Sequence, residues 1–263
     1  LGTWAIGGWW WGGTDDEKAM EAINTAVDEG VNCLDTAPVY GFGHSERVCG
    51  EAISGRRDEV IVATKCGLRW DKDIGPHHFS DDTEEVGKVD VHHNLTRDSI
   101  LWECEQSLER LGIDVIDLYQ CHWPDESTPL EETMGALMEL KDQGMIRAIG
   151  VSNFTVEMME ECMQHGELHS HQPKYSLLSP GSMEDVIPFC DDNDIASIVY
   201  SPLEQGILTG KVTPDREFAE GDKRPINNPW FQEPNLQRAL EVVDNVMKPI
   251  ADDHNCTLAQ LTI

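Results

Sequence analysis

Short apolar runs alternate with segments of helical period from one end of the chain to the other. Each run has the length of a strand, and the helical segments between runs are long enough to carry the chain back across a sheet. Strands joined in this way pair in parallel, as in repeated βα units. We expect seven strands, at residues 1–6, 31–34, 59–64, 115–120, 146–151, around Gln172, and at 196–200. The pattern predicts an α/β fold of the (β/α)8 or TIM barrel type.

The expected helices fill the intervals between these strands. They lie at residues 15–29, 45–53, 97–111, 130–143, 156–165, 183–193 and 236–254. A closed barrel needs eight strands. After the last of these helices the sequence continues through residues 257–263, which do not supply an eighth strand. The chain also begins within an expected strand and ends within an expected helix. We therefore expect residues 1–263 to form one barrel domain without its N-terminal start and its eighth βα unit, with a naturally shorter variant as the alternative.

The charge of the chain is strongly acidic, with 49 Asp and Glu against 19 Lys and Arg and a formal net charge of −30. Such a charge disfavours nucleic acid and anionic membrane surfaces as partners. Because the acidic residues are spread along the chain, we interpret them as a surface adapted to high salt, where counterions screen their repulsion. An ordinary acidic cytosolic protein is the alternative.

The cysteines indicate a reducing compartment. All eight occur singly, without a Cys-x-x-Cys pair, and several stand inside apolar runs, where a thiol acts as a small hydrophobic group. No leader pattern and no apolar stretch of membrane-spanning length occurs. We expect a cytoplasmic protein without a membrane partner. The sequence does not indicate its oligomeric state.

Two connections are too long to serve only as turns, at residues 66–96 and 202–234. Long loops in compact domains are usually functional or disordered. Both follow strand ends and are rich in polar residues, so we expect mobile lids over the mouth of the barrel. Tolerated surface insertions are the alternative interpretation.

Three of the expected strands end in an ionisable residue. Asp35, Lys65 and His122 follow the second, third and fourth strands, and Tyr40 stands shortly after Asp35. The C-terminal ends of barrel strands point into one mouth, so these residues can converge on one substrate, although each taken singly has a structural explanation. Together they suit protonation of a carbonyl oxygen, provided that something else delivers hydride to the carbon. Since a phenol is a poor acid at neutral pH, Tyr40 would need a neighbouring cation to stabilise its phenolate.

Six spaced motifs extend this pattern over nearly the whole chain. They are LGTW (1–4), DTAPVYG (35–41), ATK (63–65), CHWPD (121–125), GVSNF (150–154), and YSPL with LTGK (200–211). In this order they resemble the aldo-keto reductase family. The resemblance implies an NAD(P)-dependent oxidoreductase that reduces aldehydes or ketones to alcohols and catalyses the reverse oxidation. Tyr40 would be the general acid, with Lys65 as its cation, Asp35 as the partner of Lys65, and His122 as the group that hydrogen-bonds the substrate oxygen.

The resemblance also implies where the cofactor binds. The nicotinamide would be held by Ser152, Asn153 and Gln172, with Tyr200 stacked on its ring. The full set of expected cofactor-binding residues is Gly2, Thr3, Trp4, Ser152, Asn153, Gln172, Tyr200, Ser201, Pro202, Leu203, Gly206, Leu208, Lys211 and Arg224. Among them, Gly206, Leu208 and Lys211 would line the pyrophosphate, and Arg224 would reach the adenosine side. The resemblance implies NADPH as the cofactor. NADH stays possible, because family members usually grip the adenosine 2′-phosphate with residues after the eighth strand, and none of these is present here.

Several tryptophans fall near expected strand ends. Trp4, Trp10, Trp70 and Trp123 are expected to wall an apolar substrate pocket that favours aromatic or aliphatic carbonyl compounds. The pairs His77-His78 and His92-His93 lie in a polar loop, and adjacent histidines point apart in extended chain. We therefore expect no metal site.

Two other functions remain open at this point. Lys65 could form a Schiff base with a carbonyl substrate, as lyases on this fold do, because a desolvated lysine is a good imine former. Alternatively, the domain could bind cofactor as a regulatory or sensor subunit without significant turnover. The second alternative predicts loss of one or more of the residues Asp35, Tyr40, Lys65 and His122, and all four are present.

Overall fold

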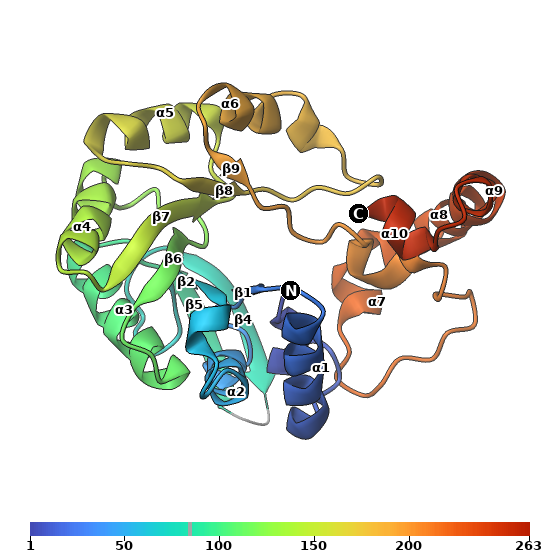
Figure 1. Cartoon of the computed structure of the whole chain (residues 1–263), viewed down its shortest axis with the longest axis horizontal. Coiled ribbons are helices and arrows are strands. Elements are labelled where there is room, and N and C mark those ends of the chain that lie inside the picture. The colour runs from blue at the N-terminus through green and yellow to red at the C-terminus, as the bar shows by residue number, and fades with distance from the viewer. Residues whose placement is uncertain (84–85) are drawn as a thin grey trace.

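A curled parallel sheet forms the centre of the molecule. The computed structural model describes residues 1–83 and 86–263, and its main sheet has the strand order β1-β2-β6-β7-β8-β9. The strands are β1 (Cys33–Asp35), β2 (Ile61–Cys66), β6 (Ile116–Cys121), β7 (Ile146–Ser152), β8 (Ser170–Gln172) and β9 (Ala196–Ser197). Neighbours pair in parallel throughout. The predicted α/β fold with a parallel sheet is confirmed, and the described strands leave the sheet open between β9 and β1 (Figure 1).

Helices cover the outer face of the sheet. They are α1 (Asp16–Asp28), α2 (His44–Ala52), α3 (Arg97–Leu111), α4 (Leu130–Asp142), α5 (Val156–His165) and α6 (Val186–Asp192). Apolar side chains fill the space between sheet and helices, among them Ile23, Leu34, Ile116, Leu137 and Ile149. This core fixes the strands, and so it fixes the positions of the residues at their C-terminal ends.

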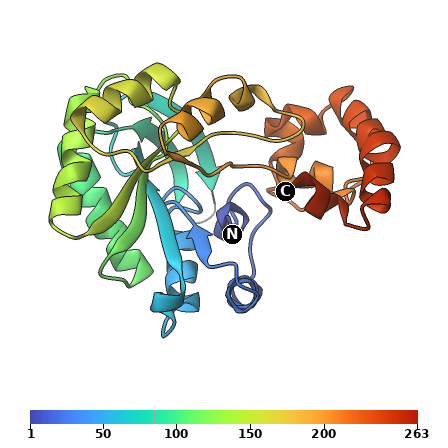
Figure 2. The same cartoon turned by 45° about the horizontal axis from the view of Figure 1, so that its top comes forward.

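The C-terminal helices lie to one side of the sheet, as the red ribbons of Figure 2 show. They are α7 (Arg224–Asn227), α8 (Asn235–Val242), α9 (Lys248–Asp253) and α10 (Leu258–Thr262). The single helix expected at 236–254 is divided by a π-helix, Val243–Met247. Pro249 follows after Lys248 and has no N–H to donate to the carbonyl four residues earlier, which explains the irregular turn. In the described ranges no helix is long and apolar enough to cross a bilayer.

The first expected strand is shorter than predicted. Leu1 and Thr3 pair with Asp35 through two backbone hydrogen bonds of 2.9 Å, and a 3₁₀ helix then runs from Trp4 to Gly7. This turn brings Gly7 against the backbone of Tyr40, where an added Cβ would lie 2.6 Å from the Tyr40 carbonyl carbon. The prediction of a strand to residue 6 is therefore wrong, because the chain bends to pack against the loop that carries Tyr40.

The connection at 66–96, expected to be a mobile lid, contains a second sheet. Its strands are β3 (Leu68–Arg69), β4 (His77–Thr83) and β5 (Gly87–His93), which pair antiparallel in the order β3-β5-β4. Val89 and Val91 alternate with polar residues on β5, and both pack into an apolar cluster with Trp9 and Phe42. The expected loop is thus an ordered hairpin, because this alternation buries one of its faces, and its role as a lid stays a prediction. Residues 84 and 85 lie outside the described residues.

The connection at 202–234 is also partly structured. It contains the 3₁₀ helices Glu204–Thr209 and Pro229–Phe231 on either side of α7. The Lys223 backbone N–H donates to the Trp10 carbonyl at 3.0 Å, and the Arg224 guanidinium lies 4.6 Å from the Trp11 ring centroid. The segment is thus attached to the tryptophan-rich start of the chain.

Candidate active site

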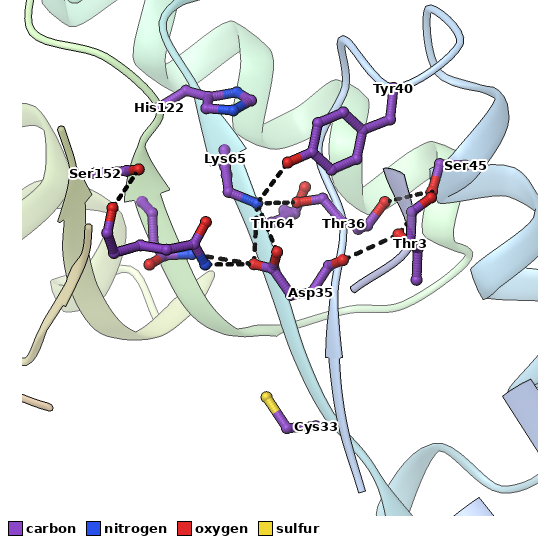
Figure 3. Close-up of polar contacts among 12 residues, drawn as sticks. Thr3, Cys33, Asp35, Thr36, Tyr40, Ser45, Thr64, Lys65, His122 and Ser152 are labelled. Carbon is purple, nitrogen blue, oxygen red and sulfur yellow. Dashed lines mark hydrogen bonds and ion pairs between the residues drawn. The ribbon is translucent and has the colours of Figure 1, made fainter. Parts of the chain in front are cut away.

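The residues predicted at the strand ends meet at one place, and Lys65 is their centre (Figure 3). Its Nζ donates to Asp35 Oδ1 at 2.9 Å, to Asp35 Oδ2 at 3.0 Å and to the Thr36 carbonyl at 2.8 Å. It also donates to the Tyr40 hydroxyl at 3.4 Å. The strands explain this convergence, because Asp35 ends β1 and Lys65 stands on the neighbouring β2.

Lys65 is completely buried, yet its ammonium is kept charged. Burial by itself lowers the pKa of Lys65, but the Asp35 carboxylate and the Tyr40 hydroxyl raise it by more, so the pKa lies above its ordinary value. The ion pair with Asp35 is only partly open to water, because the Asp35 side chain is 18% exposed. The arrangement fixes a positive charge beside the phenol.

Burial raises the pKa of Tyr40, and the Lys65 ammonium opposes this effect without overcoming it. His122 lies edge-on to Tyr40, with ring centroids 5.7 Å apart. Burial and then the charge of Lys65 hold the pKa of His122 well below its usual range, so its imidazole is neutral at neutral pH. A proton-bearing phenol and a neutral imidazole therefore share one side of Lys65, where both can face a carbonyl oxygen (Figure 3).

Hydroxyl groups beneath the ion pair hold Asp35 in place. Thr3 Oγ1 donates to the Asp35 carbonyl at 3.0 Å and lies 2.8 Å from Ser45 Oγ, which lies 2.9 Å from Thr36 Oγ1. All three hydroxyl residues are fully buried. Thr3, expected at the cofactor, therefore uses its side chain to support Asp35. Thr36 and Ser45 were not predicted as site residues, because Ser45 contacts Thr3, which is 42 residues away, and no local pattern marks such a contact.

The residues expected at the nicotinamide form one hydrogen-bonded group. Ser152 Oγ donates to the Gln172 carbonyl at 2.7 Å, and Asn153 Nδ2 donates to Ser152 Oγ at 3.0 Å. The Tyr200 hydroxyl donates to Asn153 Oδ1 at 2.9 Å, and Gln172 Nε2 donates to Asp35 Oδ1 at 3.0 Å. Two amides and two hydroxyls thus lie beside the Asp35–Lys65 pair. This donor and acceptor set fits a carboxamide.

The segment 201–206, expected near the pyrophosphate, is a tight turn with an unusual backbone. Ser201, Glu204, Gln205 and Gly206 all have positive φ, from 45° to 107°. The Glu204 and Gly206 N–H groups donate to the Ser201 and Leu203 carbonyls, at 2.8 and 3.0 Å, so the segment is tightly turned. Glu204 anchors the segment from the inside, since its buried carboxylate accepts from Ser176 Oγ at 2.5 Å. A Cβ added at Gly206 would meet only the Arg224 guanidinium, at 4.0 Å, so the surface there is open.

The other expected cofactor residues divide by exposure. Gly2 and Lys211 are exposed, and Ser201, Pro202 and Leu203 are partly buried beside the segment 201–206. Leu208 is fully buried against Val243 and Met247, so only its backbone can face a ligand.

Arg224 is held by neighbours of its own. Its guanidinium donates to Asp222 Oδ2 at 2.6 Å and to the Gln205 carbonyl at 3.1 Å. The contact with Gln205 fixes Arg224 next to the segment 201–206.

The expected pocket tryptophans gather around Tyr40. The Trp4 and Tyr40 rings stack with centroids 6.2 Å apart, and Trp10 lies 6.1 Å from Trp4. Trp10, Trp70, Trp123 and Tyr40 all pack against the apolar cluster that includes Val89 and Val91. The structure therefore brings these four tryptophans to the same side of the barrel as the phenol.

The histidine pairs face each other across the hairpin. The rings of His77 and His92 are 5.5 Å apart, and those of His78 and His93 are 4.5 Å apart. Burial, with the charges of neighbouring histidines, lowers the pKa of His78 to about 4. Within residues 1–83 and 86–263, no group of three or more His, Cys, Asp or Glu has a geometry that could hold a metal ion.

Comparisons with known proteins agree with this geometry. Aldo-keto reductase YhdN of Bacillus subtilis is 44% identical over 250 residues, which make up 94% of this chain and 70% of the relative. NADH-specific methylglyoxal reductase of Escherichia coli is 40% identical over 270 residues, 100% of this chain and 79% of the relative. The solved structure of the glycerol dehydrogenase AKR11B4 from Gluconobacter oxydans superposes with a TM-score of 0.86 at 39% identity, covering 100% of this chain and 76% of that one. A model of the Aldo/keto reductase family matches residues 1–263, and the chain belongs to this family.

Proposed function

We propose that this protein reduces aldehydes or ketones to alcohols with a reduced nicotinamide cofactor and catalyses the reverse oxidation. The observation that carries the proposal is the hydrogen bond of 3.4 Å from the buried Lys65 ammonium to the Tyr40 hydroxyl, with Asp35 on the other side of the ammonium. A phenol in this setting can give up its proton and remain as a phenolate beside a fixed positive charge.

Each residue of the group has a separate task. Tyr40 donates its proton to the carbonyl oxygen as charge develops there, and Lys65 stabilises the phenolate that remains. Asp35 keeps Lys65 charged and directed at Tyr40. His122 is neutral, so its ring N–H donates a hydrogen bond to the same carbonyl oxygen and fixes the approach of the substrate. When bound, the nicotinamide cofactor supplies the hydride.

We propose NADPH as the cofactor, with NADH as the alternative. Ser152, Asn153 and Gln172 would hold the carboxamide, and Tyr200 would stack on the nicotinamide ring. The backbone of 201–206, with Lys211 and Arg224 nearby, would hold the phosphates. The name of the Escherichia coli relative specifies NADH, which keeps that cofactor in the test.

The substrate would be a small-molecule carbonyl compound with an apolar body. Trp4, Trp10, Trp70 and Trp123 surround the region of Tyr40 and supply apolar walls.

Because the eight cysteines are all free thiols, we place the reaction in the cytoplasm.

The test follows the absorbance of NADPH and of NADH in molar salt with a panel of carbonyl compounds. The panel contains benzaldehyde and an aliphatic aldehyde, together with methylglyoxal, and glycerol tests the oxidation. We expect oxidation of reduced cofactor with at least one carbonyl compound. Cofactor binding without turnover on the whole panel would favour the sensor interpretation.

A parallel arm tests the lyase interpretation. Borohydride is added together with each carbonyl compound, and Lys65 is examined by mass spectrometry. Our proposal predicts no adduct, because Lys65 is held as a charged ammonium by Asp35 and an imine requires the neutral amine. A stable adduct on Lys65 would point to Schiff-base chemistry instead.

A further inference from the structure

Gln120 is a buried amide in the row of residues that contains Lys65. Along the sheet, the Cα of Gln120 on β6 pairs with Lys65 on β2 and with Gly150 on β7, and Gly150 pairs with Ser170 on β8. Gln120 has no exposed surface. A buried amide is costly unless its nitrogen and oxygen find partners, so its contacts should reveal why it is there.

Both ends of the Gln120 amide have partners in the barrel interior. Ser170 Oγ donates to Gln120 Oε1 at 3.4 Å, and Gln120 Nε2 donates to Asp35 Oδ1 at 3.5 Å. The Ser170 hydroxyl thereby directs the amide nitrogen toward the carboxylate. Gln172 Nε2 donates to the same oxygen at 3.0 Å, so two neutral amides and the Lys65 ammonium share Asp35 Oδ1.

Gly150 makes room for this arrangement. An added Cβ would lie 2.8 Å from Gln120 Cγ and 2.3 Å from Ser170 Oγ. The backbone of Gly150 is not in the left-handed region, so space is the reason for glycine at this place. The absence of a side chain on β7 lets Gln120 and Ser170, which stand two strands apart, touch each other.

We propose that Gln120 is a positioning residue, oriented by Ser170, that holds the Asp35 carboxylate so that the Lys65 ammonium stays directed at Tyr40. The inference rests on the proposed carbonyl reduction and concerns a residue that does not touch the substrate. Gln120 also remains as a neutral donor to Asp35 when Gln172, the second amide that donates to Asp35, binds a carboxamide.

The charges around Gln120 determine what its loss does. Its amide donates to Asp35, which pairs with Lys65, and Lys65 contacts Tyr40. His122 lies beyond Tyr40, Cys33 stands on the same strand as Asp35, and the Cys66 thiol donates to the Gln120 carbonyl at 3.6 Å. Asp35 raises the pKa of Tyr40 and Lys65 lowers it. A donor on Asp35 spreads the negative charge of the carboxylate, so removing that donor strengthens its effect on Tyr40. The phenol then becomes a weaker acid.

The test compares Gln120→Met, which keeps the volume but loses the donor, with wild type and Ser170→Ala. Alcohol oxidation is measured against pH, since its rate rises with pH until Tyr40 is ionised. We expect Gln120→Met to lose about tenfold in kcat and to move the midpoint of the profile upward by about one pH unit. Ser170→Ala is expected to shift the midpoint in the same direction by less. Cofactor Kd should stay within about twofold.

Leu118→Met is the matched control, because Leu118 stands two residues earlier on β6 and faces the same side without a polar role. It should keep the wild-type midpoint, and thermal unfolding should show that all variants are folded. Gln120→Met with wild-type kcat and midpoint would overturn the inference, and so would a lower kcat with an unchanged midpoint, which indicates packing alone. A wild type without turnover, or an active Tyr40→Phe, would instead overturn the proposed function.

Discussion

The Nζ of Lys65 lies 3.4 Å from the hydroxyl oxygen of Tyr40 while both oxygens of Asp35 accept from the same ammonium, at 2.9 and 3.0 Å. The ammonium is therefore held between an acid and its counterion. Burial raises the pKa of Tyr40, and this fixed charge is the group that counters it. The geometry accounts for a phenol that can release its proton although burial alone makes it a weaker acid.

Removing the ammonium should separate the stabilising role of Lys65 from its chemical role. Lys65→Met leaves the Asp35 carboxylate without its buried partner, and we expect a loss of about 3 kcal/mol in the free energy of unfolding. The double variant Asp35→Asn with Lys65→Met removes both charges and should recover most of that stability, while activity stays absent in both. Denaturant unfolding and cofactor oxidation are the two measurements. Activity in the double variant near the wild-type level would contradict the role given to Lys65.

Glu103 should make the stability of the fold depend on pH. Its buried carboxyl accepts from the Gly67 N–H at 3.0 Å and from Ser99 Oγ at 3.0 Å, and burial raises its pKa to about 7. The folded state keeps the proton of Glu103 to a higher pH than the unfolded state, whose value is near 4.5. The stabilisation is fully present below pH 4.5 and is lost as the pH rises toward 7.

Glu103→Gln removes this dependence. As the pH rises from 5 to 8, the unfolding free energy of wild type should fall by about 3 kcal/mol relative to that of the variant. Glu105→Gln on the same helix, at an exposed position, serves as the control and should show no such change. Equal pH dependence of Glu103→Gln and wild type would show that the buried carboxyl does not titrate in this range.

The acidic surface predicts a protein that is more stable in concentrated salt. With a net charge of −30, mutual repulsion destabilises the folded state, and at 1 M salt the screening length falls to about 3 Å. We expect the thermal midpoint to rise by about 5 °C between 0.1 M and 2 M KCl. Sucrose at matched osmolality is the control for general solvent effects. A midpoint that is independent of KCl would remove the high-salt interpretation.

The strand ends could be predicted from the sequence because the signal is local. Each apolar run stops at an ionisable residue, and a parallel sheet brings such ends together, so Asp35 and Lys65 could be placed near each other without coordinates. The antiparallel hairpin was missed because β4 is polar apart from Phe79 and only β5, with Val89 and Val91, alternates clearly.

The support beneath the site could not be predicted because its contacts are long-range. Thr3 and Ser45 are 42 residues apart, and neither carries a pattern that marks the other. Gln120 gave a partial signal, as a polar residue inside an apolar strand, but its partner Asp35 lies 85 residues away. Tertiary structure alone assigns such residues a role.

The most direct test of the account is the turnover of Tyr40→Phe, measured together with its cofactor affinity. The variant keeps the ring that stacks near Trp4 and loses only the hydroxyl that Lys65 contacts. We predict that kcat falls by at least about a hundredfold while cofactor Kd stays within about twofold of wild type. Turnover equal to that of wild type would contradict the assignment of Tyr40 as the proton donor.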